Sequence, residues 1–431
     1  MKSVCHFLEK QPAALFKIVH KTFPIIHSKN GRQNWPMMRK PLDIFTKLQY
    51  DGDSYHIRLK FQIMNSGTLV SEFSTVGGIF MERFSRVIEL LDEGFSDGAF
   101  PSGALSVGIG ADVLATHTWG PATPHTLYDI ASLSKIVSTT MIAFRFIEEG
   151  RIRLYDTLER FFPAPPDKKD ITILHLMTHT SGIPAHYYIS DETDDPADAA
   201  RVILAHPLEQ APGTGPIYSC MGYILLAKIL EQLGGAPLDV LAQNYVFDPL
   251  GMTHTTYRPT GDIAPTERDA ATGELLCGVV HDENARFLSG ISGNAGVFSD
   301  LTDMTRFVQM LVSGGRLADG TQYLSPAILR AALVNRTPGP GHEFRGLGFN
   351  LAGSPFNFLA DLMSPSAYGH TGFTGTSIAI DPETGLGMVL LTNRVCPTRA
   401  NAKLVRLRNL AHNAAAAEAS RIAAERVRER R

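Results

Sequence analysis

Segments with the pattern of β-strands lie on both sides of a long helical stretch, and this order limits the folds open to the chain. Short β-type runs occur at 104–110, 113–119, 346–351, 377–380 and 387–392. Between them, residues 136–330 are mostly helical in pattern, with Gly- and Pro-rich connections. We therefore expect an α/β sandwich whose mainly antiparallel sheet is formed by residues near 100–120 and 345–395. A helical subdomain is inserted at about 150–330.

Three segments are expected along the chain. Residues 1–80 are basic and weakly patterned, and two interpretations stay open for them: a small accessory segment, or an extension upstream of a functional body that starts near Met81. Residues 81–401 form the functional domain. Residues 402–431 form a basic C-terminal helix that packs on the sheet or extends from it.

The formal net charge of −3 is unevenly distributed. Residues 81–401 carry 21 Lys and Arg against 35 Asp and Glu, a charge of −14, whereas the two flanking segments are basic. Glutamates interleave with the arginines of 402–431, which favours a solvated helix end over a nucleic-acid or membrane contact. The longest uncharged stretches contain Gly, Pro and His and do not resemble membrane spans. We expect neither a nucleic-acid nor a membrane partner.

The cysteines point to a reducing compartment. Cys5, Cys220, Cys277 and Cys396 lie far apart and form no Cys-x-x-Cys pair, so a zinc ribbon or disulfide scaffold is not indicated. Charged residues interrupt every apolar stretch near the N-terminus, which does not fit a secretory signal. A cytoplasmic location is expected.

A serine and a lysine one helical turn apart are the first candidates for chemistry. Ser132 and Lys135 directly precede an apolar stripe that continues to Ile147, and Gly150 is placed to end that helix. On one helix face, Lys135 is close enough to share a proton with the Ser132 hydroxyl. The alternative is a capping serine beside a solvated lysine, and the pair alone does not decide between them.

Further motifs follow in a fixed order, at 173–183, 212–223, 247–252, 280–285, 293–299 and 368–376. Together with Ser132 and Lys135, this series resembles the serine hydrolases related to class C β-lactamases and penicillin-binding proteins. The resemblance covers about 85–400 and implies a β-lactamase/transpeptidase-like fold. The same family includes D-alanyl-D-alanine carboxypeptidases, D-aminopeptidases and β-lactamase-like carboxylesterases.

The resemblance implies a role for each matching residue. Ser132 corresponds to the nucleophile, Lys135 to the lysine that activates it, and Tyr218 to the tyrosine that exchanges protons with the serine and leaving group. His370, Thr371 and Gly372 correspond to the third motif, at the sheet edge. The backbone N–H groups of Ser132 and Phe373 are implied to form the oxyanion hole. No metal and no organic cofactor is expected in this mechanism.

Two positions depart from the β-lactamase pattern. Cys220 replaces the asparagine of the Tyr-x-Asn motif, so a weak thiol donor replaces an amide that positions amide substrates. His370 replaces a lysine, which removes a permanent positive charge. Together with the acidic body, these changes lead us to expect a neutral small-molecule ester or amide substrate.

Three classes of function follow from these residues. Carboxylesterase-like hydrolysis through an acyl-Ser132 intermediate is the first choice. The alternative is a D-amino-acid peptidase, a D-Ala-D-Ala carboxypeptidase or a weak β-lactamase. A third class is a non-enzymatic module that is acylated but turns over poorly.

Other histidines and tyrosines allow rival interpretations. His175 and His179, four residues apart, fit a metal-ligand pair, but no third ligand lies nearby in sequence and a structural role is favoured. His281, followed by two acidic residues, is expected to anchor a loop rather than to serve as a base for Ser132. Tyr187 and Tyr188 fit loop packing or a substrate lid equally well.

Overall fold

The computed structural model describes residues 83–429, apart from 338–341 and 355–356, and the backbone of three earlier strands. The chain divides into two compact units, Met1–Ser74 and Thr75–Arg431. In the first unit, an antiparallel sheet has the strand order β1-β2-β3, formed by Asp43–Tyr50, Tyr55–Gln62 and Leu69–Val70. The remainder of the expected extension at 1–80, and Met81, lie outside the described residues.

A six-stranded antiparallel sheet forms the centre of the second unit, with the strand order β5-β4-β11-β10-β9-β8. In chain order these strands are β4 (Gly103–Ile109), β5 (Asp112–Trp119), β8 (Asn350–Leu351), β9 (Tyr368–Thr371), β10 (Ser377–Asp381) and β11 (Leu386–Thr392). The early strand β4 pairs with the late strand β11 in a register that places Leu105 opposite Leu390. The sheet is therefore built from both ends of the domain, and the predicted α/β sandwich is confirmed.

One expected strand is much shorter than its apolar pattern suggested. Of 346–351, only Asn350 and Leu351 pair as β8. The backbone N–H groups of Leu347 and Gly348 donate instead to the carbonyl groups of Ala332 and Met177, in the helical part. Gly348 adopts a φ of +84°, which bends the chain there.

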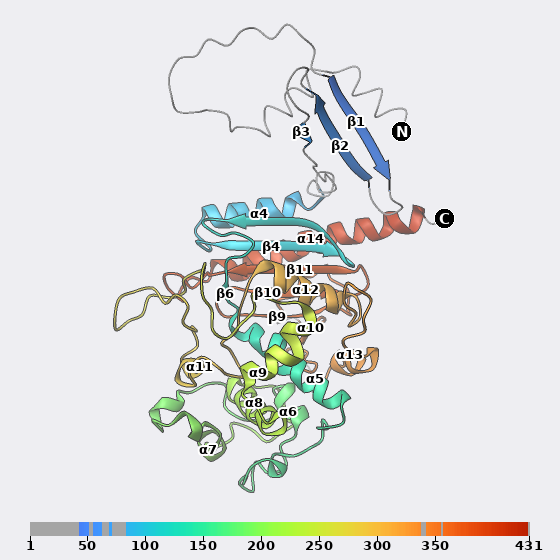
Figure 1. The fold of residues 1–431 in the computed structure, drawn as a ribbon. Coiled ribbons are helices and arrows are strands. Elements are labelled where there is room, and N and C mark those ends of the chain that lie inside the picture. The colour runs from blue at the N-terminus through green and yellow to red at the C-terminus, as the bar shows by residue number, and fades with distance from the viewer. Residues whose placement is uncertain are drawn as a thin grey trace. The chain divides into compact units, whose positions relative to one another are not determined.

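The two faces of the sheet pack against different helices (Figure 1). Along β11, Met388 and Leu390 contact a core shared with α4 (Ser85–Ser96) and α14 (Lys403–Glu429). Val389 and Leu391 point to the opposite face, into a core shared with the helical part. This alternation gives strands that are buried on both sides, as expected for the central layer of a sandwich.

The helical part follows β5 and begins with the turn that carries Ser132. This segment runs from η1 (Ala131–Leu133) through η2 (Lys135–Thr140), a π-helical stretch, into α5 (Met141–Glu148). Gly150, with a φ of +70°, follows the end of α5 as predicted. Short turns occur at η3 (Leu158–Arg160), η4 (Ile189–Asp191), η5 (Pro196–Asp198) and η6 (Gln243–Phe247).

Eight further helices complete this part. In chain order they are α6 (Ile173–Met177), α7 (Ala199–Ala205), α8 (Cys220–Gly234), α9 (Leu238–Ala242), α10 (Asp248–Leu250), α11 (Glu283–Phe287), α12 (Leu301–Val312) and α13 (Pro326–Ala332). Helix α12 contacts β10 and β11 directly. Among the helices described, none combines the length and the hydropathy needed to cross a membrane.

Candidate active site

A strained turn carries the predicted nucleophile. Strand β6 (Tyr128–Asp129) pairs with β7 (Phe298–Ser299), and the next residues lead into η1. Ala131 has a φ of +48°, which is unfavourable for a residue with a Cβ. The buried Asp129 carboxylate accepts hydrogen bonds from the N–H of Ala131 at 2.8 Å and from that of His281 at 2.7 Å. These two bonds hold the turn that presents Ser132.

The Lys135 ammonium lies beside the Ser132 hydroxyl. Lys135 Nζ donates to Ser132 Oγ at 3.0 Å and to the backbone carbonyl of Asn294 at 3.0 Å. The lysine is fully buried. The structure thus brings the two residues together on one helical turn, as their spacing predicts. The Asn294 carbonyl was not anticipated, because a backbone group leaves no signal in the sequence.

Cys220 is the third polar partner of Lys135. Its Sγ accepts from Lys135 Nζ at 3.5 Å, whereas the sequence suggested a weak thiol donor at this position. Burial alone would raise the pKa of the Cys220 thiol, but the Lys135 ammonium and a hydrogen bond with His186 lower it below its usual value. Burial alone would lower the pKa of Lys135, but its interactions with Cys220 and Tyr218 outweigh burial and raise this pKa above its usual value. Both pKa shifts act in the direction of a thiolate–ammonium pair.

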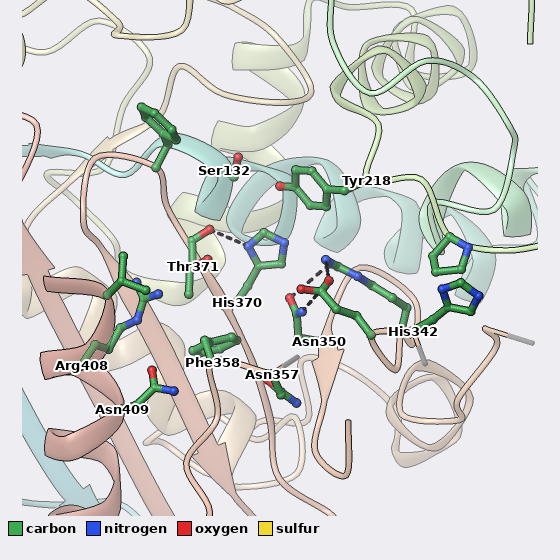
Figure 2. A pocket seen from close by; sticks show the side chains of 15 residues that line it. Ser132, Tyr218, His342, Asn350, Asn357, Phe358, His370, Thr371, Arg408 and Asn409 are labelled. Atoms are coloured by element: carbon green, nitrogen blue, oxygen red, sulfur yellow. Dashed lines mark hydrogen bonds and ion pairs between the residues drawn. The ribbon is translucent and has the colours of Figure 1, made fainter. Parts of the chain in front are cut away.

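Tyr218 covers this pair from the loop that precedes α8. Lys135 Nζ lies 4.9 Å from the centre of the tyrosine ring, and Figure 2 shows the Tyr218 hydroxyl turned toward Ser132. The His179 ring packs on Tyr218 at a centroid distance of 4.4 Å, and His179 Nδ1 accepts from the Ser219 N–H at 3.0 Å. His179 therefore positions Tyr218.

His370 enters the site from β9 and is uncharged. Its Nδ1 lies 2.8 Å from the Thr371 carbonyl oxygen, which can only accept, so Nδ1 carries the proton. Burial and the nearby Arg345 and Lys135 lower the pKa of His370 well below its ordinary value. Its Nε2 is buried without a hydrogen-bond partner among the described residues. The unprotonated Nε2 is therefore left without a donor in the described part of the chain.

Gly372 allows the sheet edge to approach the nucleophile turn. A Cβ at this position would lie 2.4 Å from the Ile130 carbonyl oxygen and 2.1 Å from Thr376 Oγ1. Thr376 Oγ1 itself donates to the Ile130 carbonyl at 3.1 Å, which fastens the strand end to the segment before Ser132. The next residue, Phe373, lines the same pocket as Ser132 and is 49% exposed. The two expected oxyanion donors thus come from elements that meet at Gly372.

A pocket of about 680 Å³ joins these groups. Ser132, Tyr218, His370, Thr371 and Phe373 line it (Figure 2). Tyr187 and Tyr188 are not among the residues that line it, and the ring of Tyr187 stacks on His206 instead. The acidic loop at 191–198 also takes no part in its lining. The charge of −14 over 81–401 is therefore a poor guide to this pocket.

Two arginines that the sequence analysis missed line the same pocket. Arg345 lies over the Tyr218 ring at 4.9 Å and is neutralised by an ion pair with Glu343. Arg408, from α14, is 91% buried, and no acidic side chain pairs with it in the described part of the chain. Burial and the neighbouring Arg394 lower the pKa of Arg408 to about 10, so it stays charged at neutral pH. Arg408 thus adds an unneutralised positive charge.

The other two histidines weighed in the sequence analysis, His175 and His281, have structural partners. His175 closes the capping box of α6 with Thr172, so it does not converge with His179 on a metal. His281 Nε2 donates to the Glu267 carboxylate at 3.1 Å, and the His281 ring stacks on Phe373 at a centroid distance of 5.6 Å. The expected loop-anchoring role of His281 is confirmed.

Comparisons with known sequences agree with this architecture. The family model for beta-lactamases matches residues 84–413. A putative D-alanyl-D-alanine carboxypeptidase of Salmonella typhi is 32% identical over 321 residues, which cover 66% of this chain and 73% of that one. A protein of the same description from Salmonella paratyphi A is 30% identical over the same length.

Solved structures show the same fold at low sequence identity. A penicillin-binding protein homologue from Caulobacter crescentus has a TM-score of 0.62 at 22% identity, covering 77% of this chain and 98% of that one. EstCE1, a hydrolase with promiscuous acyltransferase activity, has a TM-score of 0.62 at 21% identity, covering 78% and 100%. An octameric penicillin-binding protein homologue from Pyrococcus abyssi has a TM-score of 0.58 at 23% identity, covering 72% and 73%.

Proposed function

The chain belongs to the beta-lactamase family of serine hydrolases, and from that premise we propose that it cleaves an ester or amide through an acyl-Ser132 intermediate. The observation that carries the proposal is the 3.0 Å contact between Lys135 Nζ and Ser132 Oγ, because Ser132 lines a pocket large enough for a small substrate. Carboxylesterase-like activity is the first candidate.

In the proposed acylation, Ser132 Oγ attacks the substrate carbonyl carbon and forms the new C–O bond. Its proton passes to a neighbouring basic group, for which we propose the Tyr218 oxygen as a phenolate, or the unprotonated His370 Nε2. The bond to the leaving group then breaks, and the leaving group takes up that proton. Backbone N–H groups of Ser132 and Phe373 stabilise the oxyanion.

In the second half-reaction a water attacks the acyl-Ser132 carbonyl, gives its proton to the same acceptor, and the released Ser132 oxygen recovers a proton. Esters need less positioning than amides, because their leaving groups depart more readily. With Cys220 in place of a residue that carries a side-chain amide, ester substrates are favoured.

A second candidate, hydrolysis of a peptide that ends in a free carboxylate, is favoured by one observation. Arg408 lines the pocket as a buried guanidinium without an acidic partner in the described chain, and a guanidinium binds a carboxylate with two parallel hydrogen bonds. Such a contact would supply the positive charge that is lost where His370 replaces the lysine of the family motif.

A substrate panel beside Ser132→Ala tests these proposals. We expect sustained turnover of p-nitrophenyl acetate and butyrate that the variant loses. Turnover of D-Ala-D-Ala peptides at higher kcat/KM would support the peptidase, and nitrocefin reports β-lactamase activity. A labelled penicillin that stays on Ser132 without any turnover would indicate the acylatable binding module instead. Absence of both turnover and labelling by a serine-directed phosphonate would contradict the proposed function.

A further inference from the structure

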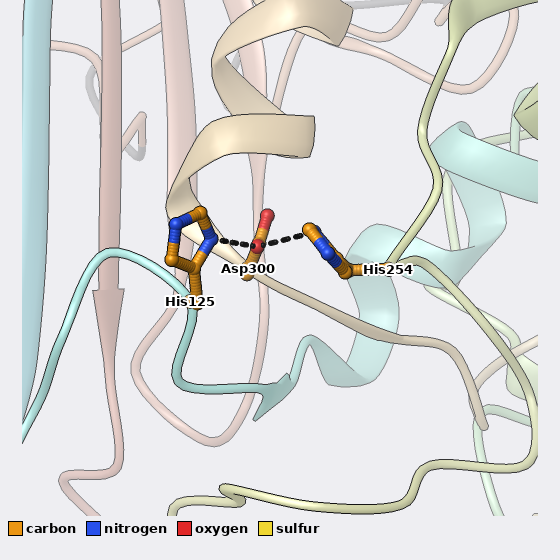
Figure 3. A group of neighbouring side chains, drawn as sticks. All are labelled: His125, His254 and Asp300. Carbon is orange, nitrogen blue, oxygen red and sulfur yellow. Dashed lines mark hydrogen bonds and ion pairs between the residues drawn. The ribbon is translucent and has the colours of Figure 1, made fainter.

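Two histidines and an aspartate from distant parts of the sequence meet outside the pocket described above. The His–His–Asp cluster consists of His125, in the loop before β6, His254, in the loop after α10, and Asp300, which caps the start of α12 (Figure 3). One oxygen of Asp300, Oδ2, lies 3.2 Å from His125 Nδ1 and 2.9 Å from His254 Nδ1. A single carboxylate oxygen thus faces two imidazole nitrogens.

We propose that the His–His–Asp cluster binds a zinc ion that clamps these three segments together. A tetrahedral zinc site has bonds of about 2.0 to 2.2 Å to nitrogen and oxygen, so its ligand atoms lie roughly 3.3 Å from one another. The two Nδ1-to-Oδ2 distances are already close to that separation, and one candidate ligand atom from each residue fits within a group spanning 4.8 Å. Small rotations of the histidine rings complete the geometry.

The charges around the cluster favour a cation. The side chain of Asp300 is fully buried, and the described part of the chain supplies only the two histidines as its ion-pair partners. Asp303, one turn later and also fully buried, adds a second carboxylate that is paired with Arg306. A divalent ion held by the two imidazoles would neutralise the buried Asp300 carboxylate.

The ligand types, and the hydrogen bonds that orient them, suit zinc. Imidazole and carboxylate together favour zinc and neighbouring transition ions over magnesium or calcium, which prefer oxygen ligands. Asp300 Oδ1 accepts from the Asp303 N–H at 2.8 Å, which orients the carboxylate. Asp303 Oδ2 accepts from the N–H groups of His254 and Thr255 at 2.7 and 2.9 Å, which holds the second loop.

An ion can reach the cluster from solvent. The side chains of His125 and His254 are 64% and 48% exposed. Their outward faces leave a fourth position for water or for a ligand supplied by solvent. Because Asp300 directly follows β7, and β7 pairs with β6 just before Ser132, the ion would stabilise the strand pair beneath the nucleophile turn.

Zinc titration of the full chain by calorimetry tests the proposal. We expect one equivalent of Zn²⁺ that is lost in the double variant His125→Ala/His254→Ala, and an affinity at least about tenfold weaker in Asp300→Asn, which retains the capping oxygen. The matched control is His206→Gln, which removes a surface histidine that pairs with a single carboxylate, Glu192, at 2.7 Å. This control variant should still bind one equivalent of Zn²⁺.

Two further readouts do not depend on activity. Zn²⁺ should raise the Tm of the wild type and of Ser132→Ala equally, and leave the double variant unchanged. Bound Co²⁺ should give visible d–d absorption without a thiolate charge-transfer band, because no cysteine takes part. Failure of the wild type to bind Zn²⁺, an equivalent that survives in the double variant, or a thiolate band would each overturn the proposal.

Discussion

The Cys220 sulfur lies 3.5 Å from the Lys135 ammonium, so the lysine of the Ser-x-x-Lys motif is paired with a group that can carry negative charge. An asparagine at this position would stay neutral. The pairing ties the charge of Lys135 to the ionisation of Cys220.

Alkylation of Cys220 should show a shifted pH dependence. Because the Lys135 ammonium and His186 lower the pKa of the Cys220 thiol, its reaction with iodoacetamide should reach half-maximum at a lower pH than that of Cys277. Cys277 is exposed and serves as an internal reference measured by peptide mass spectrometry. A higher pH midpoint for alkylation of Cys220 than for Cys277 would contradict a lowered Cys220 pKa. In Cys220→Ser, any loss of activity on alkylation that disappears is due to modification of Cys220.

Replacing Arg408 should weaken the binding of carboxylate-bearing substrates only. A lost charged hydrogen-bond pair costs about 1.5 to 3 kcal/mol, so Arg408→Met should raise KM for a carboxylate-terminated peptide roughly tenfold to a hundredfold. The KM for p-nitrophenyl acetate should change little. Arg406→Met, at an exposed position on the same helix, is the control. Equal effects of Arg408→Met on both substrates would rule out a carboxylate contact.

Removing the free nitrogen of His370 should slow the reaction. His370→Phe takes away the unpaired Nε2, and loss of a general base commonly costs about a hundredfold or more in kcat. The pKa of His370 is held well below its usual value, so the wild-type profile should show no step from this residue near pH 6.5. Unchanged activity of His370→Phe from pH 5 to 9 would exclude His370 from proton transfer.

Buried His412 should make the fold sensitive to acid. Burial, aided by Arg408, lowers the pKa of His412 to about 3, so the folded state disfavours its protonation. Above about pH 6.5 His412 is neutral in both the folded and the unfolded state, so it does not reduce the free energy of unfolding. As the pH drops toward 3, the unfolded state takes up a proton that the folded state does not, and the free energy of unfolding falls. The loss is up to about 1.4 kcal/mol for each pH unit.

Urea unfolding of the wild type and His412→Gln between pH 7 and 4.5 measures this effect. The glutamine retains a donor for the Phe358 carbonyl, which His412 contacts at 3.3 Å, but does not titrate. The variant should therefore lose less free energy of unfolding as the pH falls. Parallel pH dependences would show that His412 is not the source.

The order of strand and helix patterns was sufficient to predict the sandwich, because apolar periodicity determines which faces are buried. Ser132, Lys135, Tyr218 and His370 could be predicted because their motifs lie within short, recognisable segments. Their catalytic roles stay predictions.

Other parts of the site leave no local pattern. Arg408 reaches the pocket from α14, after the last strand, and Asp129 acts through backbone N–H groups. The His–His–Asp cluster is likewise invisible in sequence, because tertiary folding alone brings its three loops together. Net charge over 81–401 does not describe the pocket, since charges act there according to distance and burial, and the expected neutral substrate stays a prediction.

The pairing of β4 with β11 has a consequence for how the protein is made. The Ser102 N–H bonds to Asn393 Oδ1 across 291 positions of sequence, next to the strand pair. On the ribosome, the β4–β5 hairpin emerges before β11 has been made, so the backbone N–H and C=O groups along the free edge of β4 stay unpaired until then. Ribosome-bound chains that stop before β11 should therefore depend on chaperones and lack hydrolase activity, however long they are held.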